Sequence, residues 1–368
     1  MIIDDKIQAR KEIENLKVYV PGKPIEEVQR ELGLTQITKL ASNENPYGCS
    51  PQVIEAIAGE MKNNALYPEA TAPALSEKLA KRLNIEKYHI FFGNGSAEII
   101  SLLTRAYIRP GDEAVMADST FPRYQSNVLI GGGQPIRVPL IDGVHDLDKM
   151  LAAVTEKTRM IFICNPNNPT GTIVEKDRLR SFVENVPTSV LLVMDEAYYE
   201  FMNKDDALDT VALLASHPNL VLLRTFSKIY GLAALRIGYG LMHPSIQTEL
   251  NKVKEAFNTN RLAQAAALAA LDDNRFVEEC AQKNAAGRSY LIAELEKMGL
   301  SCFASHANFL MVKVGRSGNE VFQGLLRQGV IVRSGAAFGY PETIRVTVGA
   351  QDENETFIKA LGQVLNQG

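Results

Sequence analysis

Short runs of β-branched apolar residues alternate with longer amphipathic stretches from about residue 89 onward, and this alternation constrains the fold more than any other feature of the sequence. It is typical of an α/β protein in which a mostly parallel sheet is covered by helices. Helix candidates between the runs include Ala97–Ile108, which follows a glycine-rich turn and ends before Pro110-Gly111. We expect a large domain built on a sheet of seven strands: His89–Phe92, Glu113–Met116, Pro135–Val138, Met160–Cys164, Val190–Met194, Leu220–Arg224 and Ile237–Leu241.

The pattern changes after Asn260. An alanine-rich helix candidate, Leu262–Leu271, leads into a long charged helical region and then into strand candidates near Asn308–Val312 and Ile344–Val348. This succession predicts a second, smaller α+β domain. The first forty residues show no clear alternation, and we expect them to form an arm that leans on another part of the protein. The predicted division is a large domain at residues 45–261 and a small domain at residues 262–368 together with the arm, residues 1–44.

The composition excludes several classes of protein. The formal net charge of −4 comes from 39 basic and 43 acidic residues spread along the chain, so no net field favours nucleic acid or an anionic membrane. The first residues, Met1–Leu16, lack the apolar core of a signal peptide, and no later stretch approaches the roughly 18 apolar residues of a spanning helix. We therefore expect a cytoplasmic protein with neither a nucleic-acid nor a membrane partner.

The four cysteines are scattered, with no C-x-x-C pair and no histidine at the spacing of a metal ligand. This usage is typical of reduced thiols in a cytosolic protein. The four residues are Cys49, Cys164, Cys280 and Cys302. We expect no disulfide, no structural zinc and no other metal site.

Polar residues directly follow five of the candidate strands. In open parallel sheets the loops and helix N-termini converge beyond the carboxyl ends of the strands, and ligands bind there. The segments at that edge are Gly93–Ser96, Asp118–Phe121, Asn165-Pro166, Asp195–Tyr198 and Ser227-Lys228. We expect these segments to form one site.

Taken singly, each of these segments has an ordinary explanation. The glycine-rich turn before Ala97 either binds a phosphate on the helix N-terminus or is only a tight turn. Asp195 either caps a helix or, at the end of a buried strand, faces a cationic partner such as a protonated pyridine nitrogen. Lys228 is either a solvated surface charge or, among apolar neighbours and near Arg236, an amine whose pKa is depressed for Schiff-base chemistry.

The combination and order of the motifs carry a resemblance to a known family. Four linked motifs are Asn165–Gly171, Asp195–Tyr198, Thr225–Lys228 with Gly231, and Arg236–Gly238. Together they resemble the fold-type I aminotransferases that use pyridoxal phosphate, and the resemblance covers nearly the whole chain. Further motifs resemble the histidinol-phosphate aminotransferase branch of that family: Tyr19–Pro24, Ala41–Gly48, Phe257–Gln264 and Ile344–Gly349.

The resemblance implies roles for residues that bind the cofactor ring. Lys228 matches the Schiff-base lysine, and Asp195 matches the partner of the pyridine nitrogen. Asn165 and Tyr198 match the two hydrogen-bond donors to the phenolate oxygen of the ring. Phe121 matches the aromatic residue that stacks on the ring; the family often has tyrosine there, so the stacking face remains while a hydroxyl contact is lost.

The resemblance also implies how the cofactor phosphate is held. Its ligands would be the backbone amides of Ser96 and Ala97, with Ser227 and Arg236. Tyr67 would reach the phosphate from a second subunit, which implies a homodimer.

The expected reaction is reversible amino transfer between histidinol phosphate and 2-oxoglutarate, giving imidazole-acetol phosphate and glutamate in histidine biosynthesis. Arg345 matches the arginine that grips the α-carboxylate, while Tyr19 and Arg333 would bind the phosphate of the substrate. Because histidinol phosphate carries no carboxylate, we expect Arg345 to serve the carboxylate of glutamate in one half-reaction and the phosphate end in the other.

Three other functions remain open at this point. A pocket suited to an imidazole ring also accepts a phenyl ring, so an aromatic amino acid aminotransferase is the nearest rival. A phospho-amino-acid decarboxylase shares the cofactor and a phosphate pocket but releases carbon dioxide. A non-catalytic ligand-binding module is disfavoured because the matched residues are intact and no DNA-binding segment is appended.

Overall fold

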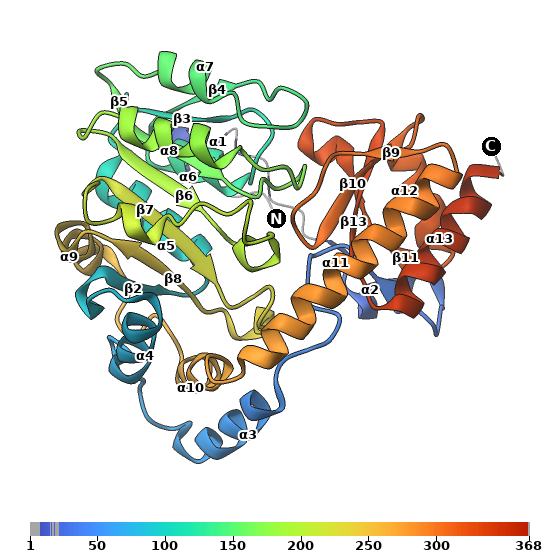
Figure 1. Ribbon diagram of the computed structural model, residues 1–368, viewed down its shortest axis with the longest axis horizontal. Helices are drawn as coiled ribbons and strands as arrows, with labels where there is room; N and C mark the ends of the chain where they lie inside the picture. Colours follow the sequence, from blue (N-terminus) through green and yellow to red (C-terminus); the bar gives the residue numbers. More distant parts are fainter. Residues whose placement is uncertain (1–7, 15, 17, 19–21, 367–368) are drawn as a thin grey trace.

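A seven-stranded sheet forms the larger half of the protein (Figure 1), in a computed structural model that describes residues 8–14, 16, 18 and 22–366. The strands in spatial order are β2 (Ile90–Gly93), β8 (Gly238–Met242), β7 (Leu220–Thr225), β6 (Leu191–Asp195), β5 (Thr158–Cys164), β3 (Glu113–Ala117) and β4 (Gln134–Val138). β8 runs antiparallel to both of its neighbours, and the other adjacent pairs are parallel. The predicted mostly parallel seven-stranded sheet is confirmed, with each strand within a few residues of its expected bounds.

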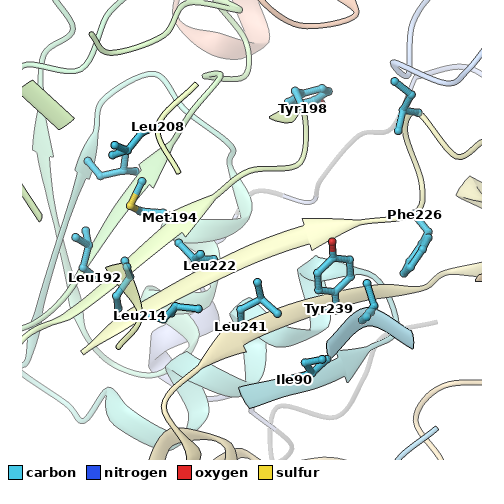
Figure 2. Packing of buried hydrophobic residues seen from close by; sticks show 14 of the residues in the cluster. Ile90, Leu192, Met194, Tyr198, Leu208, Leu214, Leu222, Phe226, Tyr239 and Leu241 are labelled. Atoms are coloured by element: carbon cyan, nitrogen blue, oxygen red, sulfur yellow. The ribbon is translucent and has the colours of Figure 1, made fainter. Parts of the chain in front are cut away.

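Successive residues of the central strands pack into two different hydrophobic cores. Met194, Leu222 and Leu241 are register partners on β6, β7 and β8, and they lie in the same core. Figure 2 shows these three side chains within that core. The residues next to two of them, Val193 and Leu223, belong to the core on the opposite face. Because side chains alternate along a strand, such nearly continuous apolar runs require that helices cover both faces of the sheet.

Helices cover the sheet on both sides, as the nearly continuous apolar strands require. Residues of α5, α6 and α9 pack into one core, and residues of α4, α7, α8 and α10 pack into the other. Their bounds are α4 (Pro73–Leu83), α5 (Ser96–Tyr107), α6 (Arg123–Ile130), α7 (Leu147–Ala152), α8 (Lys176–Asn185), α9 (Pro244–Val253) and α10 (Arg261–Ala270). The expected helices at 97–108 and 262–271 are therefore α5 and α10, each beginning one residue earlier than predicted.

A second, four-stranded antiparallel sheet lies beside the first, with its own hydrophobic core. The long helix α11 extends from the region of α10 to this sheet (Figure 1). The strands in spatial order are β12 (Arg333–Ser334), β13 (Thr343–Thr347), β10 (Phe309–Lys313) and β9 (Ser301–Cys302). The accompanying helices are α11 (Asn274–Lys297), α12 (Gly318–Arg327) and α13 (Gln351–Asn366). The two strands expected near 308–312 and 344–348 are β10 and β13.

Residues 25–40 of the N-terminal region pack against this second half. The strand β1 (Thr38–Lys39) pairs in parallel with β11 (Val330–Ile331), and Val28 of α2 (Ile25–Leu32) packs against Ile331. The remaining N-terminal helices are α1 (Lys11–Glu14) and α3 (Pro51–Glu60). The segment after β1 thereby enters the space between the two sheets.

Over the residues described, no helix is long and apolar enough to cross a membrane. The four cysteine thiols are free. The described residues contain no group of three or more histidine, cysteine, aspartate or glutamate side chains that could hold a metal ion.

A close backbone approach joins the N-terminal segment to the loop after β7. Gly231 has a φ of +71°, and a Cβ atom at this position would clash with the backbone carbonyl of Gly48. Only glycine meets both demands, because a side chain disfavours this backbone conformation as well as the contact.

We predict that Gly231→Ala lowers the free energy of unfolding by about 3 kcal/mol or more, since backbone strain and a clash add together. Gly111→Ala is the matched control, because Gly111 has a φ of +88° with nothing within 4 Å of its Cβ position. The control should lose only about 1–2 kcal/mol, the cost of the backbone conformation. Urea denaturation of both variants measures the difference, and equal losses would contradict the role assigned to the Gly48 contact.

Candidate active site

A pocket of about 220 Å³ opens between the carboxyl ends of the parallel strands and the second sheet. Four parts of the chain line it: the loops of the large sheet, Gly22 of the N-terminal arm, the segment 41–43 after β1, and the region from β12 to β13 of the second sheet. The lining residues are Gly22, Ala41, Ser42, Asn43, Ser96, Ala97, Phe121, Pro122, Cys164, Asn168, Asp195, Ala197, Tyr198, Thr225, Ser227, Lys228, Arg236, Arg333, Phe338 and Arg345. The site expected at the strand ends is therefore shared with residues from both ends of the sequence.

Asp195 is the last residue of β6, and its carboxylate is buried at the bottom of the pocket. Its Oδ2 accepts a hydrogen bond from the Tyr124 hydroxyl at 2.7 Å, and its Oδ1 accepts one from the backbone N–H of Ala197 at 3.1 Å. Burial raises the pKa of the carboxyl to about 6, although both hydrogen bonds favour the charged form. No ion pair joins Asp195 to a cationic side chain of the described residues, so the carboxylate is suited to a cationic ligand group.

Lys228 lies three residues beyond β7, and its Nζ donates a hydrogen bond to the backbone carbonyl of Ser42 at 3.1 Å. Burial lowers the pKa of this amine to about 8, and the positive charges of Arg345 and Arg236 contribute in the same direction. A substantial fraction of the amine is therefore neutral near pH 8. The neutral amine is the form that attacks a carbonyl carbon.

The N-terminus of α5 forms one wall of the pocket with Arg236. Gly95, the residue before α5, has a φ of +77°, and a Cβ there would collide with the Arg236 guanidinium. The guanidinium donates to Ser227 Oγ at 3.1 Å and to the carbonyl of Ala233 at 3.0 Å. The first amides of a helix have no acceptor within the helix, so this corner presents several donors and a positive charge to an anion.

Arg333 and Arg345 are direct cross-strand neighbours on β12 and β13, and both line the pocket. The ring of Phe338 lies 5.8 Å from the first guanidinium and 5.1 Å from the second. Like charges directly opposite each other destabilise a strand pair, so a bound anion would stabilise this arrangement. The charges on this side of the pocket are therefore suited to bind a second anion, and we refer to it as the second anion-binding corner.

Tyr198 connects these groups through two asparagine amides. Its hydroxyl oxygen accepts from Asn43 Nδ2 at 3.0 Å and from Asn168 Nδ2 at 3.4 Å. Arg345 donates to Asn168 Oδ1 at 2.6 Å and to the carbonyl of Ala41 at 2.9 Å. Burial raises the pKa of Tyr198 well above its ordinary value, so the hydroxyl remains protonated.

Asn165, expected from the sequence to face the cofactor ring, does not line the pocket. Its backbone N–H pairs with the carbonyl of Asp195 at 3.0 Å, and its side-chain Oδ1 accepts from the N–H of Val174 at 2.9 Å. The following turn instead carries Asn168 to the pocket. The sequence-based expectation named the first asparagine after the strand, Asn165, whereas the turn brings the third asparagine, Asn168, to the pocket.

The other expected site residues divide into three groups. Ser96, Ala97, Phe121, Ser227, Arg236, Arg333 and Arg345 line the pocket together with Asp195, Tyr198 and Lys228. Tyr67 lies outside this pocket, where it is 78% exposed and stacks on Phe257 with ring centroids 4.6 Å apart. Tyr19 lies outside the described residues.

Sequence reasoning missed Asn43, Asn168 and Tyr124. Asn43 and Asn168 stand inside motifs that carried the resemblance, and Tyr124 stands three residues after Phe121. The hydrogen-bond partners of all three residues come from distant parts of the chain, which local sequence does not reveal.

Residues 35–361 of the chain match the model of the family "Aminotransferase class I and II". A crystal structure of histidinol-phosphate aminotransferase from Sinorhizobium meliloti in complex with pyridoxal-5'-phosphate is 28% identical, with a TM-score of 0.91 and 99% of both chains covered. A Thermus thermophilus aspartate aminotransferase structure, 20% identical over 98% of this chain and 99% of that one, has a TM-score of 0.85 and shares the fold. Fold, pocket and family match define a class I and II aminotransferase.

Curated relatives are similar over almost their full length. The histidinol-phosphate aminotransferase of Geobacillus sp. (strain WCH70) is 49% identical over 361 residues, 98% of this chain and 99% of the relative. That of Bacillus subtilis (strain 168) is 45% identical over 360 residues, 98% of this chain and 100% of the relative. Within the class, this chain belongs to the histidinol-phosphate aminotransferase family.

We predict that Lys228 of the cofactor-free protein reacts with formaldehyde and cyanoborohydride along a pH curve whose midpoint is about 8. The reason is that only the neutral amine reacts, and the neutral fraction rises as the pH passes the lowered pKa. Peptide mass spectrometry measures methylation of this residue at each pH. The same residue in the urea-unfolded chain should have its midpoint near the ordinary value of about 10.4, and identical midpoints in the two states would contradict the prediction.

Proposed function

We propose that this protein catalyses reversible amino transfer between histidinol phosphate and 2-oxoglutarate, with pyridoxal phosphate as cofactor, as a step of histidine biosynthesis. The observation that carries the proposal is the pocket in which Lys228 and the buried Asp195 lie between two anion-binding corners. One corner is formed by α5 and Arg236, and the other by Arg333 and Arg345. The near full-length identity to the curated relatives supports the choice of substrates.

The residues of the pocket fit pyridoxal phosphate. Glycine at position 95 leaves room for Arg236 beside the first amides of α5, which suits a phosphate. Asp195 is a buried carboxylate without an ion-pair partner in the described part of the chain, which suits a protonated ring nitrogen. Lys228, with its lowered pKa, suits covalent attachment of an aldehyde. Phe121 would cover one face of the ring.

Bound pyridoxal phosphate supplies an aldehyde carbon for the amino group and a protonated ring that withdraws electron density from the reacting carbon. Asp195 keeps the ring nitrogen protonated, because a buried carboxylate stabilises an adjacent positive charge. Nζ of Lys228 moves the proton at Cα of the substrate. Its pKa of about 8 is close to the pH at which a general base works best in a neutral cell.

Asn168, rather than Asn165, is the asparagine proposed to donate a hydrogen bond to the ring oxygen, together with the Tyr198 hydroxyl. Its amide reaches the pocket while that of Asn165 is engaged with Val174. Two neutral donors stabilise an anionic oxygen without introducing a competing charge.

Arg345 is proposed to bind the α-carboxylate of glutamate and the phosphate end of histidinol phosphate in the two half-reactions. Arg333 and Tyr19 would bind the substrate phosphate with it. The cross-strand placement of Arg333 and Arg345 supports this assignment for the two arginines. A planar guanidinium pairs with two oxygens of either anion.

The proposal includes a division into two domains, predicted from the sequence at residues 45–261 and 262–368 with the arm 1–44, and a cytoplasmic location. Separate hydrophobic cores in the two sheets and the pairing of β1 with β11 support two domains, with β1 on the second. Because α10 packs into the core of the large sheet, we propose that the boundary follows α10 rather than preceding it.

We also propose that the enzyme is a homodimer in which Tyr67 completes the phosphate site of the other subunit. Tyr67 lies outside the pocket of its own chain and is exposed, as are the apolar side chains of Ile54, Met61 and Leu66 in the same stretch of the chain. Several exposed apolar side chains in one stretch are typical of a contact surface. A symmetric dimer would place the two copies of this surface against each other.

An amino-donor screen with 2-oxoglutarate tests the function. Purified protein with bound cofactor should form glutamate fastest from histidinol phosphate, and Lys228→Ala should lower the rate by about 10³-fold or more. Faster turnover of phenylalanine or tyrosine would favour the aromatic aminotransferase. Release of carbon dioxide from threonine phosphate without keto-acid formation would favour the decarboxylase, and failure to take up pyridoxal phosphate would favour a non-catalytic module.

We predict that Arg333→Gln lowers kcat/KM for histidinol phosphate by about 10–100-fold, since one charge-assisted contact to the phosphate is lost. The glutamate half-reaction should change little. Arg345→Gln is the matched comparison and should impair both half-reactions. Single-turnover absorbance changes of the bound cofactor measure each half-reaction. If Arg333→Gln left histidinol phosphate unaffected while Arg345→Gln abolished its turnover, the phosphate assignment of Arg333 would be wrong.

We predict that mixing Lys228→Ala with Tyr67→Ala subunits restores activity that neither variant has alone. Each hybrid dimer would contain one site with an intact Lys228 from one subunit and an intact Tyr67 from the other, so random exchange should yield about one quarter of normal activity. Native mass spectrometry verifies that hybrids form. If hybrid dimers form but the mixture is no more active than the two variants measured separately, Tyr67 serves its own chain. Tyr67→Phe separates the contribution of the hydroxyl from that of the ring.

A further inference from the structure

The hydroxyl oxygen of Tyr198 receives N–H groups from two amides, and neighbouring residues determine the orientation of both amides. The Thr347 hydroxyl accepts from the backbone N–H of Asn43 at 3.0 Å and donates its own proton to Oδ1 of Asn43 at 3.2 Å. With its oxygen engaged in this way, Asn43 must direct its NH₂ group toward Tyr198, 3.0 Å away.

The same reasoning applies to Asn168. Arg345 is only a donor, and its Nη1 lies 2.6 Å from Asn168 Oδ1. The amide nitrogen of Asn168 is thereby the atom that faces Tyr198, at 3.4 Å. Neither amide offers Tyr198 an acceptor, and no hydrogen bond from the tyrosine hydroxyl to another described residue is formed.

From this arrangement we infer that Asn43 is a positioning residue, which fixes the direction of the Tyr198 hydroxyl proton so that this proton is offered to the ring oxygen of the cofactor. The inference rests on the proposed use of pyridoxal phosphate. Because a phenol has a single proton, a donor on one side of its oxygen orients that proton toward the remaining acceptor. The acceptor would be the anionic ring oxygen.

The backbone holds Asn43 firmly in this role. The residue is 1% exposed and has a φ of +54°, a conformation that asparagine, aspartate and glycine adopt more readily than other residues. Its carbonyl accepts from Asn308 Nδ2 at 3.1 Å. The two preceding carbonyls, of Ala41 and Ser42, accept from Arg345 and Lys228.

Aspartate is the informative replacement, because Asn43→Asp keeps the shape and the backbone preference while it exchanges the donor for an acceptor. The carboxylate would draw the tyrosine proton away from the pocket. It also adds a negative charge, which by itself acts on the cofactor and on the other charged groups around Tyr198, namely Asp195, Lys228 and Arg345.

A double-mutant cycle with Tyr198→Phe separates the two effects, because the charge effect persists when the hydroxyl is absent and the proton effect does not. The readout is the pH midpoint of the absorbance change of bound pyridoxal phosphate in the holoenzyme. A hydrogen bond donated to the ring oxygen stabilises its negative charge, so the proton shared between this oxygen and the nitrogen of Lys228 is lost at a lower pH. Loss of the hydrogen bond therefore raises the pH midpoint. We expect Asn43→Asp to raise the midpoint by about 1 pH unit more with Tyr198 present than in the Tyr198→Phe background.

Equal shifts in the two backgrounds would overturn the role of Asn43 while leaving the proposed function intact. Absence of any cofactor absorbance in the unsubstituted protein would overturn both. Asn43→Gly repeats the cycle without an added charge, and glycine accepts the same φ. We expect this variant to raise the pH midpoint by a smaller amount, and only when Tyr198 is present. An equal rise in the Tyr198→Phe background would also overturn the role of Asn43. Cofactor stoichiometry and thermal unfolding establish that each variant is folded and loaded.

Discussion

The active-site pocket depends on the buried carboxylate of Asp195, which forms no ion pair with any side chain in the described part of the chain. Asp195 ends a strand whose five residues are all buried, and its carboxylate accepts hydrogen bonds from a tyrosine hydroxyl and a backbone amide. The next residue shows the contrast. Glu196 is equally buried, but it pairs with Arg224 at 2.8 Å and accepts from the Thr210 hydroxyl at 2.6 Å. A paired buried carboxylate serves the fold, whereas one without a cation is available for a positively charged ligand group.

The fold was largely predictable, because its strands are buried on both faces and so have nearly continuous apolar sequences. Parallel pairing then brings the residues after β6 and β7 to one edge, and Asp195 and Lys228 were placed together correctly for this reason. What periodicity does not contain is the path of an irregular turn. The turn after β5 presents Asn168 to the pocket, and only the three-dimensional path shows that Asn165 faces Val174.

Contacts between distant segments were the other part that sequence reasoning did not reach. Asn43 lies within a motif of the sequence, yet its hydrogen-bond partners Tyr198, Asn308 and Thr347 follow it by 155, 265 and 304 positions. Nothing in the local sequence distinguishes a tyrosine that only packs in the core from one, such as Tyr124, that also donates to Asp195. The roles of such residues depend on hydrogen-bond direction, which requires all the partners to be known.

The segment 41–43 connects the chemistry of the large sheet to the anion-binding corner of the second sheet. Ala41, Ser42 and Asn43 contact Arg345, Lys228 and Tyr198, respectively. Thr347 of β13 holds this segment to the second sheet, because its hydroxyl accepts from the backbone N–H of Asn43 and its backbone N–H donates to the carbonyl of Leu40. A displacement of β13 would therefore move Arg345 and the partners of Lys228 and Tyr198 together. Substrate anions bound by Arg345 and Arg333, as proposed, would act on the same strand pair. Binding of the substrate anion and orientation of the proposed catalytic groups would thus be linked through one short segment of backbone.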